Sequence, residues 1–341
     1  MKIGEVLEEY EKVHIPKDDY LVPSNEISMD KDGTIVFEGD ASNYHLTDHA
    51  MTQLVRKVRT LAGLPASVMT TRYLKACPSH SRAFQINDWI SNYDDDKKWM
   101  FRVEQNGGRI KAVLSDNYSK LDNMDLLNIV KDTHNGIEFN DVWMNTDTLH
   151  LRYTNPATRK GSGKLATVAG WHTTNSEIGT RSVSVGFLIY QLICTNGLMG
   201  LRPQDIYRKR HVGDMDIKYD FAAALENFDV AAAKEEVDKV INTEEMIIEE
   251  PTWDVYKAVQ QNFPALNKSV IELAKEKIDN YDDEHKGFTK FGLISSLTES
   301  IRDLHSADAR YDAEKVVGKL FNQNSLELQD GDESKIIRIG A

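Results

Sequence analysis

The clearest pattern of hydrophobic and polar positions lies between Lys164 and Gly200. The residues from Thr180 to Ile193 are rich in Val, Ile, Phe, Leu and Tyr, which favours a buried β-strand over a loop. A second apolar run, Leu165 to Trp171, precedes it, and the polar residues 173–179 join the two, so the pattern predicts a hairpin with a long loop. The alternation breaks at Gly186, which a β-bulge or burial of both strand faces would explain.

Other strands are predicted on either side of this hairpin. Asn196-Gly197 is typical of a tight turn, because both residues accept positive φ, and should end the long strand. Two alternating runs joined by Asn-Gly-Gly predict a second hairpin over Lys98 to Ser115. Shorter strands are expected at residues 137–144 and 148–153, and a small hairpin is expected around residues 30–33.

Helical periodicity is found near the N-terminus and throughout the last third of the chain. Thr47 precedes an apolar stripe at helical spacing and is expected to cap a helix. Beyond Phe221 the pattern predicts one long helix over residues 222–241, and Pro251 should begin the next. The apolar residues Ile336 to Ile339 could add a short strand or contact a partner. Further helices are expected at residues 3–13, 124–134, 267–280, 288–305 and 309–321.

Together these elements predict an α+β fold, with a mixed or antiparallel β-sheet core, flanking helices and a helical C-terminal region. The length of 341 residues is enough for a sizeable core and for more than one domain. From composition we divide the chain into a variable N-terminal segment (1–44), a basic α+β core (45–220), an acidic helical region (221–321) and a polar tail (322–341).

The charge of the chain changes sign along its length, around a formal net charge of −13. Residues 1–52 carry 4 Lys and Arg against 12 Asp and Glu, residues 53–218 carry 23 against 16, and residues 219–341 carry 14 against 26. A basic middle between acidic ends fits a core that binds a polyanion, with flanks that mediate self-association or limit non-specific binding. Ordinary variation of charge along an acidic protein gives the same pattern, so both interpretations stay open.

Several protein classes do not fit the sequence. No stretch approaches the roughly 20 apolar residues of a membrane-spanning helix, and the N-terminus is acidic where a signal peptide is basic and apolar. We therefore expect a cytoplasmic protein of a bacterial host cell, with no membrane association. Cys77 and Cys194 are too few and too far apart for a disulfide framework or a cysteine zinc site. His45 and His49 have metal-ligand spacing but no third ligand beside them, so we expect no metal and no cofactor.

Basic and aromatic residues of the middle segment are the candidate contacts to a nucleic-acid backbone. If the cationic positions of both strands in the hairpin at 98–115 point to the same face, that face carries Arg and Lys side chains and could contact phosphates. Alternation of polar and apolar residues gives the same pattern on any half-exposed sheet. The loop 159–164 is basic but lacks the P-loop pattern, and the dense cluster at 208–211 would also fit a solvated loop. Trp171 and two tyrosines could stack on bases. The candidate nucleic-acid-binding residues are Arg102, Arg109, Lys111, Arg159, Lys160, Lys164, Arg181, Arg208, Lys209, Arg210, Tyr118 and Tyr207.

Several segments occur together in a recognisable order: LTDHAMTQLVRKV with GLPASV, INDWI, RIKAVLSDNYSKLDN with DLL, TNSEIGTRSVSVGFLIYQLICTNGL and FTKFGLISSLTESI. Across residues 45–321 the chain thereby resembles a phage- and plasmid-like protein family of unknown function. The resemblance implies a context on mobile elements rather than an activity. By analogy of fold alone, a β-rich core followed by helices is similar to the single-strand annealing recombinases of phages and eukaryotes, which form rings or filaments around single-stranded DNA. The resemblance assigns no individual DNA contact.

We expect the protein to bind single-stranded DNA without catalysis, as a homo-oligomer that serves replication or recombination of a phage or plasmid. A first alternative is a metal-dependent nuclease in which Asp116, Asp122 and Glu177 hold Mg²⁺, although Asp and Asn beside turns are more often caps. A second alternative is a structural or host-interaction protein whose acidic ends bind a phage or host partner.

Overall fold

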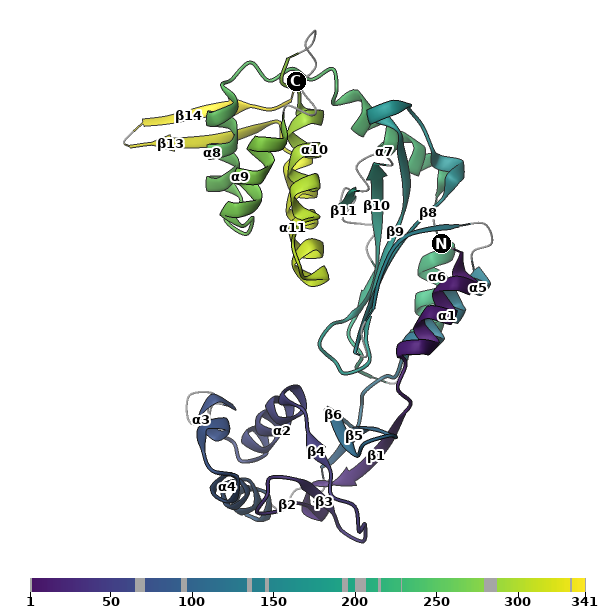
Figure 1. The fold of residues 1–341 in the computed structure, drawn as a ribbon, viewed down its shortest axis with the longest axis vertical. Helices are drawn as coiled ribbons and strands as arrows, with labels where there is room; N and C mark the ends of the chain where they lie inside the picture. Colours follow the sequence, from purple (N-terminus) through teal and green to yellow (C-terminus); the bar gives the residue numbers. More distant parts are fainter. Residues whose placement is uncertain are drawn as a thin grey trace.

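The fold is given by a computed structural model, which describes residues 2–64, 71–92, 97–133, 137–144, 147–191, 196–199, 207–213, 216–227, 229–278, 287–331 and 333–340. It is an α+β fold with mixed and antiparallel sheets, as the sequence predicts. The N-terminal lobe lies at the bottom of Figure 1, and the central sheet and the helical C-terminal lobe lie side by side above it. Within the described ranges, no helix is long and apolar enough to cross a membrane.

Residues 17–115 form the N-terminal lobe. Its elements are β1 (Lys17–Pro23), β2 (Ile27–Met29), β3 (Ile35–Phe37), β4 (His45–Leu46), α2 (Asp48–Leu61), α3 (Thr71–Ala76), α4 (Ser79–Ser91), β5 (Lys98–Glu104) and β6 (Arg109–Ser115). The main sheet has the order β1-β5-β6-β4, in which β4 is parallel to β6 and the other pairs are antiparallel. Thr47 caps α2 by accepting a hydrogen bond from the Ala50 amide, as predicted. The helices pack on the sheet through a core that includes Leu54 and Phe101.

The central lobe combines the first helix with residues 116–227. Its elements are α1 (Ile3–Val13), α5 (Asn123–Thr133), β7 (Glu138–Met144), β8 (Thr148–Thr154), β9 (Thr167–Ser176), β10 (Val183–Gln191), β11 (Asn196–Met199), β12 (Tyr207–Lys209) and α6 (Ile217–Glu226). The sheet has the order β11-β10-β9-β8-β7, and β12 pairs with the first residues of β10. Helices α1, α5 and α6 share an apolar core with the sheet that includes Tyr153, Val185 and Phe221. The chain therefore leaves this lobe after α1, builds the N-terminal lobe and returns at α5.

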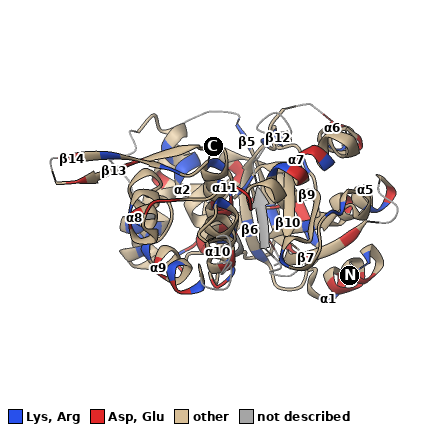
Figure 2. Cartoon of the chain, turned by 90° about the horizontal axis from the view of Figure 1, so that it is seen from above, with Lys and Arg blue, Asp and Glu red and all other residues tan. Residues whose placement is uncertain are grey.

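The C-terminal lobe is helical and ends in a small hairpin. Its elements are α7 (Val230–Asn242), α8 (Thr252–Asn262), α9 (Lys268–Lys277), α10 (Lys290–Ile301), α11 (Ala307–Phe321), β13 (Ser325–Asp330) and β14 (Glu333–Arg338). Helix α10 is almost entirely buried and forms the centre of the lobe. The core reaches the central sheet through Phe187 and Ile189 of β10. Figure 2 shows acidic and basic stretches interspersed along these helices.

Most predicted elements are present. The hairpins expected at 98–115 and around 30–33 are β5–β6 and β2–β3, and the strands expected at 137–144 and 148–153 are β7 and β8. Helices α1, α2, α5, α9, α10 and α11 lie close to their predicted ranges, and α8 begins directly after Pro251. The short strand expected in the tail is part of β14.

The polar connection predicted at residues 173–179 is wrong, because β9 continues to Ser176. All β9 residues are buried, and several of the polar ones have hydrogen-bond partners. The Thr174 hydroxyl lies 2.7 Å from the Ser184 hydroxyl, and the Asn175 amide donates to a backbone carbonyl 2.8 Å away. Hydrogen bonding therefore offsets the cost of burying these side chains, which a pattern of polar residues alone does not reveal.

Three further expectations are decided by the fold. At Gly186 the register between β9 and β10 runs without a shift and most of β10 is buried, so burial of both faces explains the pattern and a bulge does not. Asn196-Gly197 begins β11 and does not form the expected turn, while the expected strand end at Ile193 lies outside the described residues. Residues 222–241 belong to two helices, α6 and α7, because the Asp229 carboxylate accepts two amide hydrogen bonds and caps α7.

Candidate functional site

A cleft of about 620 Å³ lies where the three lobes meet. Its walls come from α2 and β6 of the N-terminal lobe, from the β9–β10 turn and β12 of the central lobe, and from α11 of the C-terminal lobe. The β9–β10 hairpin, which has the strongest pattern in the sequence, therefore supplies part of the site. The cleft depends on how the lobes are placed, since no single lobe forms it.

The tip of the β9–β10 hairpin is fixed against the N-terminal lobe. The Ile178 carbonyl accepts hydrogen bonds from Gln53 Nε2 at 2.9 Å and from His49 Nε2 at 3.0 Å, both on α2. Gly179 follows with a φ of +73°, and a Cβ at this position would lie 3.0 Å from Leu114 Cδ2 on β6. Only glycine combines this backbone conformation with so close an approach, so the tip closes one side of the cleft without a side chain of its own.

Strand alternation sends the cations of β12 to opposite faces of the sheet. Arg208 pairs with Ser184 in the β10 register, and both line the cleft. Tyr207 packs against the apolar core on the other face. Lys209 lies 3.9 Å from a carboxylate of α6. Arg210, the next residue, lines the cleft again. Of the dense basic cluster, the structure therefore brings Arg208 and Arg210 to the site and turns Tyr207 and Lys209 away from it.

Positive charge dominates the cleft walls. Two carboxylates, Asp308 and Asp312, line the same space, and Asp308 lies 2.6 Å from Arg181 Nε. Among the described residues, the exposed Arg208 and Arg210 form no ion pair. These two guanidinium groups are therefore not neutralised by a carboxylate of the described ranges. The six basic residues that line the cleft are Arg56, Lys57, Arg181, Arg208, Arg210 and Lys315.

Aromatic rings line the cleft beside these charges. The rings of Tyr118 and His211 stack with centroids 5.1 Å apart and planes inclined by 10°. The Tyr118 hydroxyl donates to the Ser176 carbonyl at 3.1 Å, which fixes the ring. Burial lowers the pKa of His211, so this imidazole is neutral near pH 7 and adds no charge. On the facing wall, Lys315 Nζ lies 3.7 Å from the centroid of the Tyr311 ring.

A buried polar layer lies between the sheet and α11, beside the cleft. His150 Nε2 is 2.8 Å from Asp308 Oδ1, and Arg152 Nη2 donates to Glu314 Oε2 at 2.6 Å. Burial raises the pKa of the Glu314 carboxyl to about 7, although the guanidinium of Arg152 opposes this rise. His172 is 1% exposed, and neither of its ring nitrogens has a hydrogen-bond partner in the described part of the chain. Burial therefore holds its pKa well below the usual value and keeps the ring neutral.

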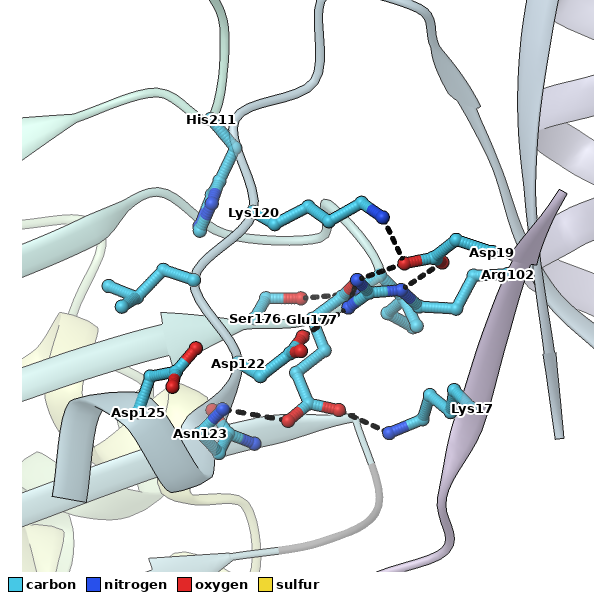
Figure 3. A network of polar contacts seen from close by, with 12 residues as sticks. Lys17, Asp19, Arg102, Lys120, Asp122, Asn123, Asp125, Ser176, Glu177 and His211 are labelled. Atoms are coloured by element: carbon cyan, nitrogen blue, oxygen red, sulfur yellow. Dashed lines mark hydrogen bonds and ion pairs between the residues drawn. The ribbon is translucent and has the colours of Figure 1, made fainter. Parts of the chain in front are cut away.

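Arg102 does not lie on a solvent-facing basic surface, as the hairpin pattern suggested. It is 2% exposed, and Figure 3 shows its guanidinium between carboxylates of the N-terminal and central lobes. Its Nε lies 2.9 Å from Asp19 Oδ1, and its Nη1 lies 2.7 Å from Asp122 Oδ1 and 2.9 Å from the Glu177 carbonyl. Lys17 forms an ion pair with the Glu177 carboxylate in the same network. Burial without these partners would be costly, so the fold uses Arg102 to join two lobes.

The other cations of the 98–115 hairpin also lie outside the cleft. Lys111 is 8% exposed, and its Nζ lies 3.0 Å from Asp147 and 3.5 Å from Glu104. Arg109 is exposed at the start of β6 and pairs in register with His45 on β4. The prediction of one cationic hairpin face is therefore wrong, because the pleat buries Lys111 among carboxylates.

The loop cations lie at the opposite end of β9. Arg159 and Lys164 are exposed there, and Lys160 pairs with Asp238 of α7. They are not brought together with Arg208 and Arg210. Trp171 cannot stack on a base, because it is 3% exposed and packs against Tyr153 with ring centroids 5.2 Å apart.

The carboxylates considered for a metal site are not gathered into one. Asp122 contacts Arg102, and Glu177 contacts Lys17 and accepts from the Asn123 amide at 2.7 Å. Asp116 is exposed and lines a different pocket. In the described ranges, no group of three His, Cys, Asp or Glu side chains is placed to hold a metal ion.

Sequence reasoning missed three cleft cations. Arg56 and Lys57 lie on the polar side of α2, which any solvated helix shows, and Lys315 lies in the acidic helical region. Four of the predicted residues line the cleft: Arg181, Arg208, Arg210 and Tyr118. A search of protein-family models, of curated proteins and of solved structures found no match to this chain.

Proposed function

We propose that the cleft binds single-stranded nucleic acid through its phosphate backbone, without catalysis. The observation that carries the proposal is that, among the described residues, six Lys and Arg gather against two Asp around one cleft, in a chain with a net charge of −13. Unneutralised cations in a concave surface attract a polyanion and release its counterions on binding. Because the chain as a whole is acidic, its net charge does not supply this attraction.

The dimensions of the cleft favour a single strand over a duplex. A volume of about 620 Å³ is in the range of small-molecule sites and leaves room for a few nucleotides. The half-buried ring of Tyr118 offers aromatic surface near the cations, as in proteins that stack unpaired bases beside a basic groove.

Fluorescence anisotropy of labelled single-stranded and duplex DNA, over a salt series, tests the proposal. Arg208→Ala/Arg210→Ala should weaken single-strand binding by about 10- to 100-fold and flatten the dependence of affinity on salt, since each lost phosphate contact removes about 0.7 from the logarithmic slope. Arg159→Ala/Lys164→Ala removes the same charge at the far end of β9 and should bind like the parent. An equal loss of affinity in both variants, or no binding at low salt, would rule out the cleft as the binding site.

The same titration separates the two alternative functions. A probe shortened in the presence of Mg²⁺ would indicate a nuclease, although the described carboxylates offer no metal site. Absence of DNA binding, together with capture of one stoichiometric protein partner, would favour a structural or host-interaction role for the acidic ends.

Self-association is the second part of the proposal, and the C-terminal hairpin supports it. On β13, side chains of Gln261 and Asn262 bond the outward backbone groups of residues 327 and 329. Residue 336 lies opposite 327 in the ladder and so also turns its backbone groups outward, and Ile336 is 57% exposed. A second copy of the chain could add a strand there. Light scattering measures the mass, and a single-chain mass at every concentration would exclude this part.

A further inference from the structure

A second pocket of about 510 Å³ adjoins the cleft across α2. Three residues line both spaces: Arg56, Lys57 and Ser115. Beyond them, the second pocket is bounded by the end of α2, by the start of β5 and by the loop after β6. The two spaces therefore meet along one helix, and the α2 cations belong to both.

The second pocket has the same electrostatic character as the cleft. Lys97 and Lys98 are exposed in its wall beside Arg56 and Lys57, and among the described residues that line the pocket one, Asp116, carries a carboxylate. Trp99 is 4% exposed and anchors this wall in the core of the N-terminal lobe. The pocket thus presents cations on a rigid strand and helix, as a polyanion site requires.

We infer that the cleft and the second pocket form one continuous track, so that the ligand is a polymer long enough to pass α2 and not a single nucleotide or a short end. The inference rests on the proposed function and specifies its substrate class. A bound strand would have its phosphates beside Arg208 and Arg210 in the cleft, pass Arg56 and Lys57, and continue past Lys98. Affinity must then rise with oligonucleotide length until both spaces are filled.

Lys98 is the residue that tests the track. Its side chain is exposed at the first position of β5, where truncation leaves the strand pairing of the backbone intact. Lys97 is less suitable, because it follows Asp94, Asp95 and Asp96 in the sequence, which lie outside the described residues. A matched control is Lys131→Ala, an exposed lysine in the last turn of α5 that lines neither space.

The experiment measures the affinity of the full chain for oligothymidylates of about 4, 8 and 16 nucleotides, which bracket the site sizes of single-strand-binding folds. Lys98→Ala should lower the affinity for the longest oligonucleotide by about 3- to 10-fold and reduce the slope of log affinity against log salt by about 0.7. The affinity for the shortest oligonucleotide should stay within about 2-fold of the parent. Asp116→Asn removes a negative charge from the second pocket and should raise the affinity for the longer oligonucleotides only. Lys131→Ala should match the parent at every length.

The outcomes distinguish the track from the function on which it rests. If oligonucleotides bind but Lys98→Ala changes all lengths equally or none, the track is overturned and the cleft proposal stands. If affinity does not rise between the shortest and longest ligand, the track is likewise overturned. If no oligonucleotide binds at low salt, both proposals fall together.

Discussion

The ion-pair network around Arg102 and the basic cleft contain the same residue types but use them in opposite ways. Arg102 is 2% exposed and contacts Asp19, Asp122 and a backbone carbonyl, whereas Arg208 and Arg210 are exposed and form no ion pair among the described residues. Figure 3 shows how closely the carboxylates surround the buried guanidinium. A count of basic residues therefore does not locate a binding surface, because pairing and burial decide which cations can meet a ligand.

The difference has a physical cause. A charge taken out of water needs a partner, because desolvation costs several kcal/mol per ion. An exposed charge keeps its hydration and can stay unpaired at small cost until a ligand displaces the water. The network accordingly contributes to holding the N-terminal and central lobes together, and the cleft remains available for binding.

The largest expected effect comes from breaking the network. Arg102→Met should lower the free energy of unfolding by about 3–5 kcal/mol, because it leaves the carboxylates of Asp19 and Asp122 without their shared cation. Urea denaturation of the full chain measures this loss. Lys160→Met breaks the more exposed pair with Asp238 and should cost at most about 1 kcal/mol. Equal costs for the two variants would show that the network is no more important than a surface pair.

A smaller effect is expected from the buried layer beside the cleft. Burial and the nearby Asp141 raise the pKa of Glu314 to about 7, against the opposing effect of Arg152. The unfolded carboxyl titrates near about 4.3, so between these values the unfolded chain binds fewer protons than the native one. The contribution of Glu314 to stability is therefore fully present below pH 4 and falls as the pH rises to 7.

Glu314→Gln removes this dependence. The stability of the variant relative to the parent should rise by up to about 3 kcal/mol between pH 4.5 and 7, which thermal or urea unfolding at several pH values measures. Glu235→Gln changes an exposed carboxyl and serves as the control. Parallel pH profiles for the parent and Glu314→Gln would contradict the prediction.

The smallest expected effect on stability comes from the cleft itself. Arg208→Ala/Arg210→Ala should change the free energy of unfolding by less than about 0.5 kcal/mol, since the two side chains are exposed and their loss also reduces repulsion among six cations. The same variant is expected to lose most of its nucleic-acid affinity. A stability loss above about 1 kcal/mol would show that these cations have protein partners in solution, and the contrast with Arg102 would disappear.

The fold was largely predictable where the pattern is local. Alternation at 98–115 and helical spacing at 48–61 depend on neighbours in sequence, and both elements are present. The pattern failed where distant partners intervene. Residues 173–176 are polar but lie in a buried strand, where Thr174 contacts Ser184 and Asn175 donates to a backbone carbonyl. Asp229 divides one apparent helix into two by capping the second.

What the sequence by itself determined is the α+β class, most of the elements and the presence of a basic middle segment. Only the tertiary structure decided which cations form the cleft, because their neighbours are far away along the chain. Asp19 and Arg102 are separated by 83 positions, and Lys17 and Glu177 by 160. Lys315 belongs to the acidic helical region but lines the cleft, whereas Arg102 belongs to the basic middle segment but is buried. Electrostatic pairing acts through space and depends on burial, so the spacing of charges along the sequence cannot encode it alone.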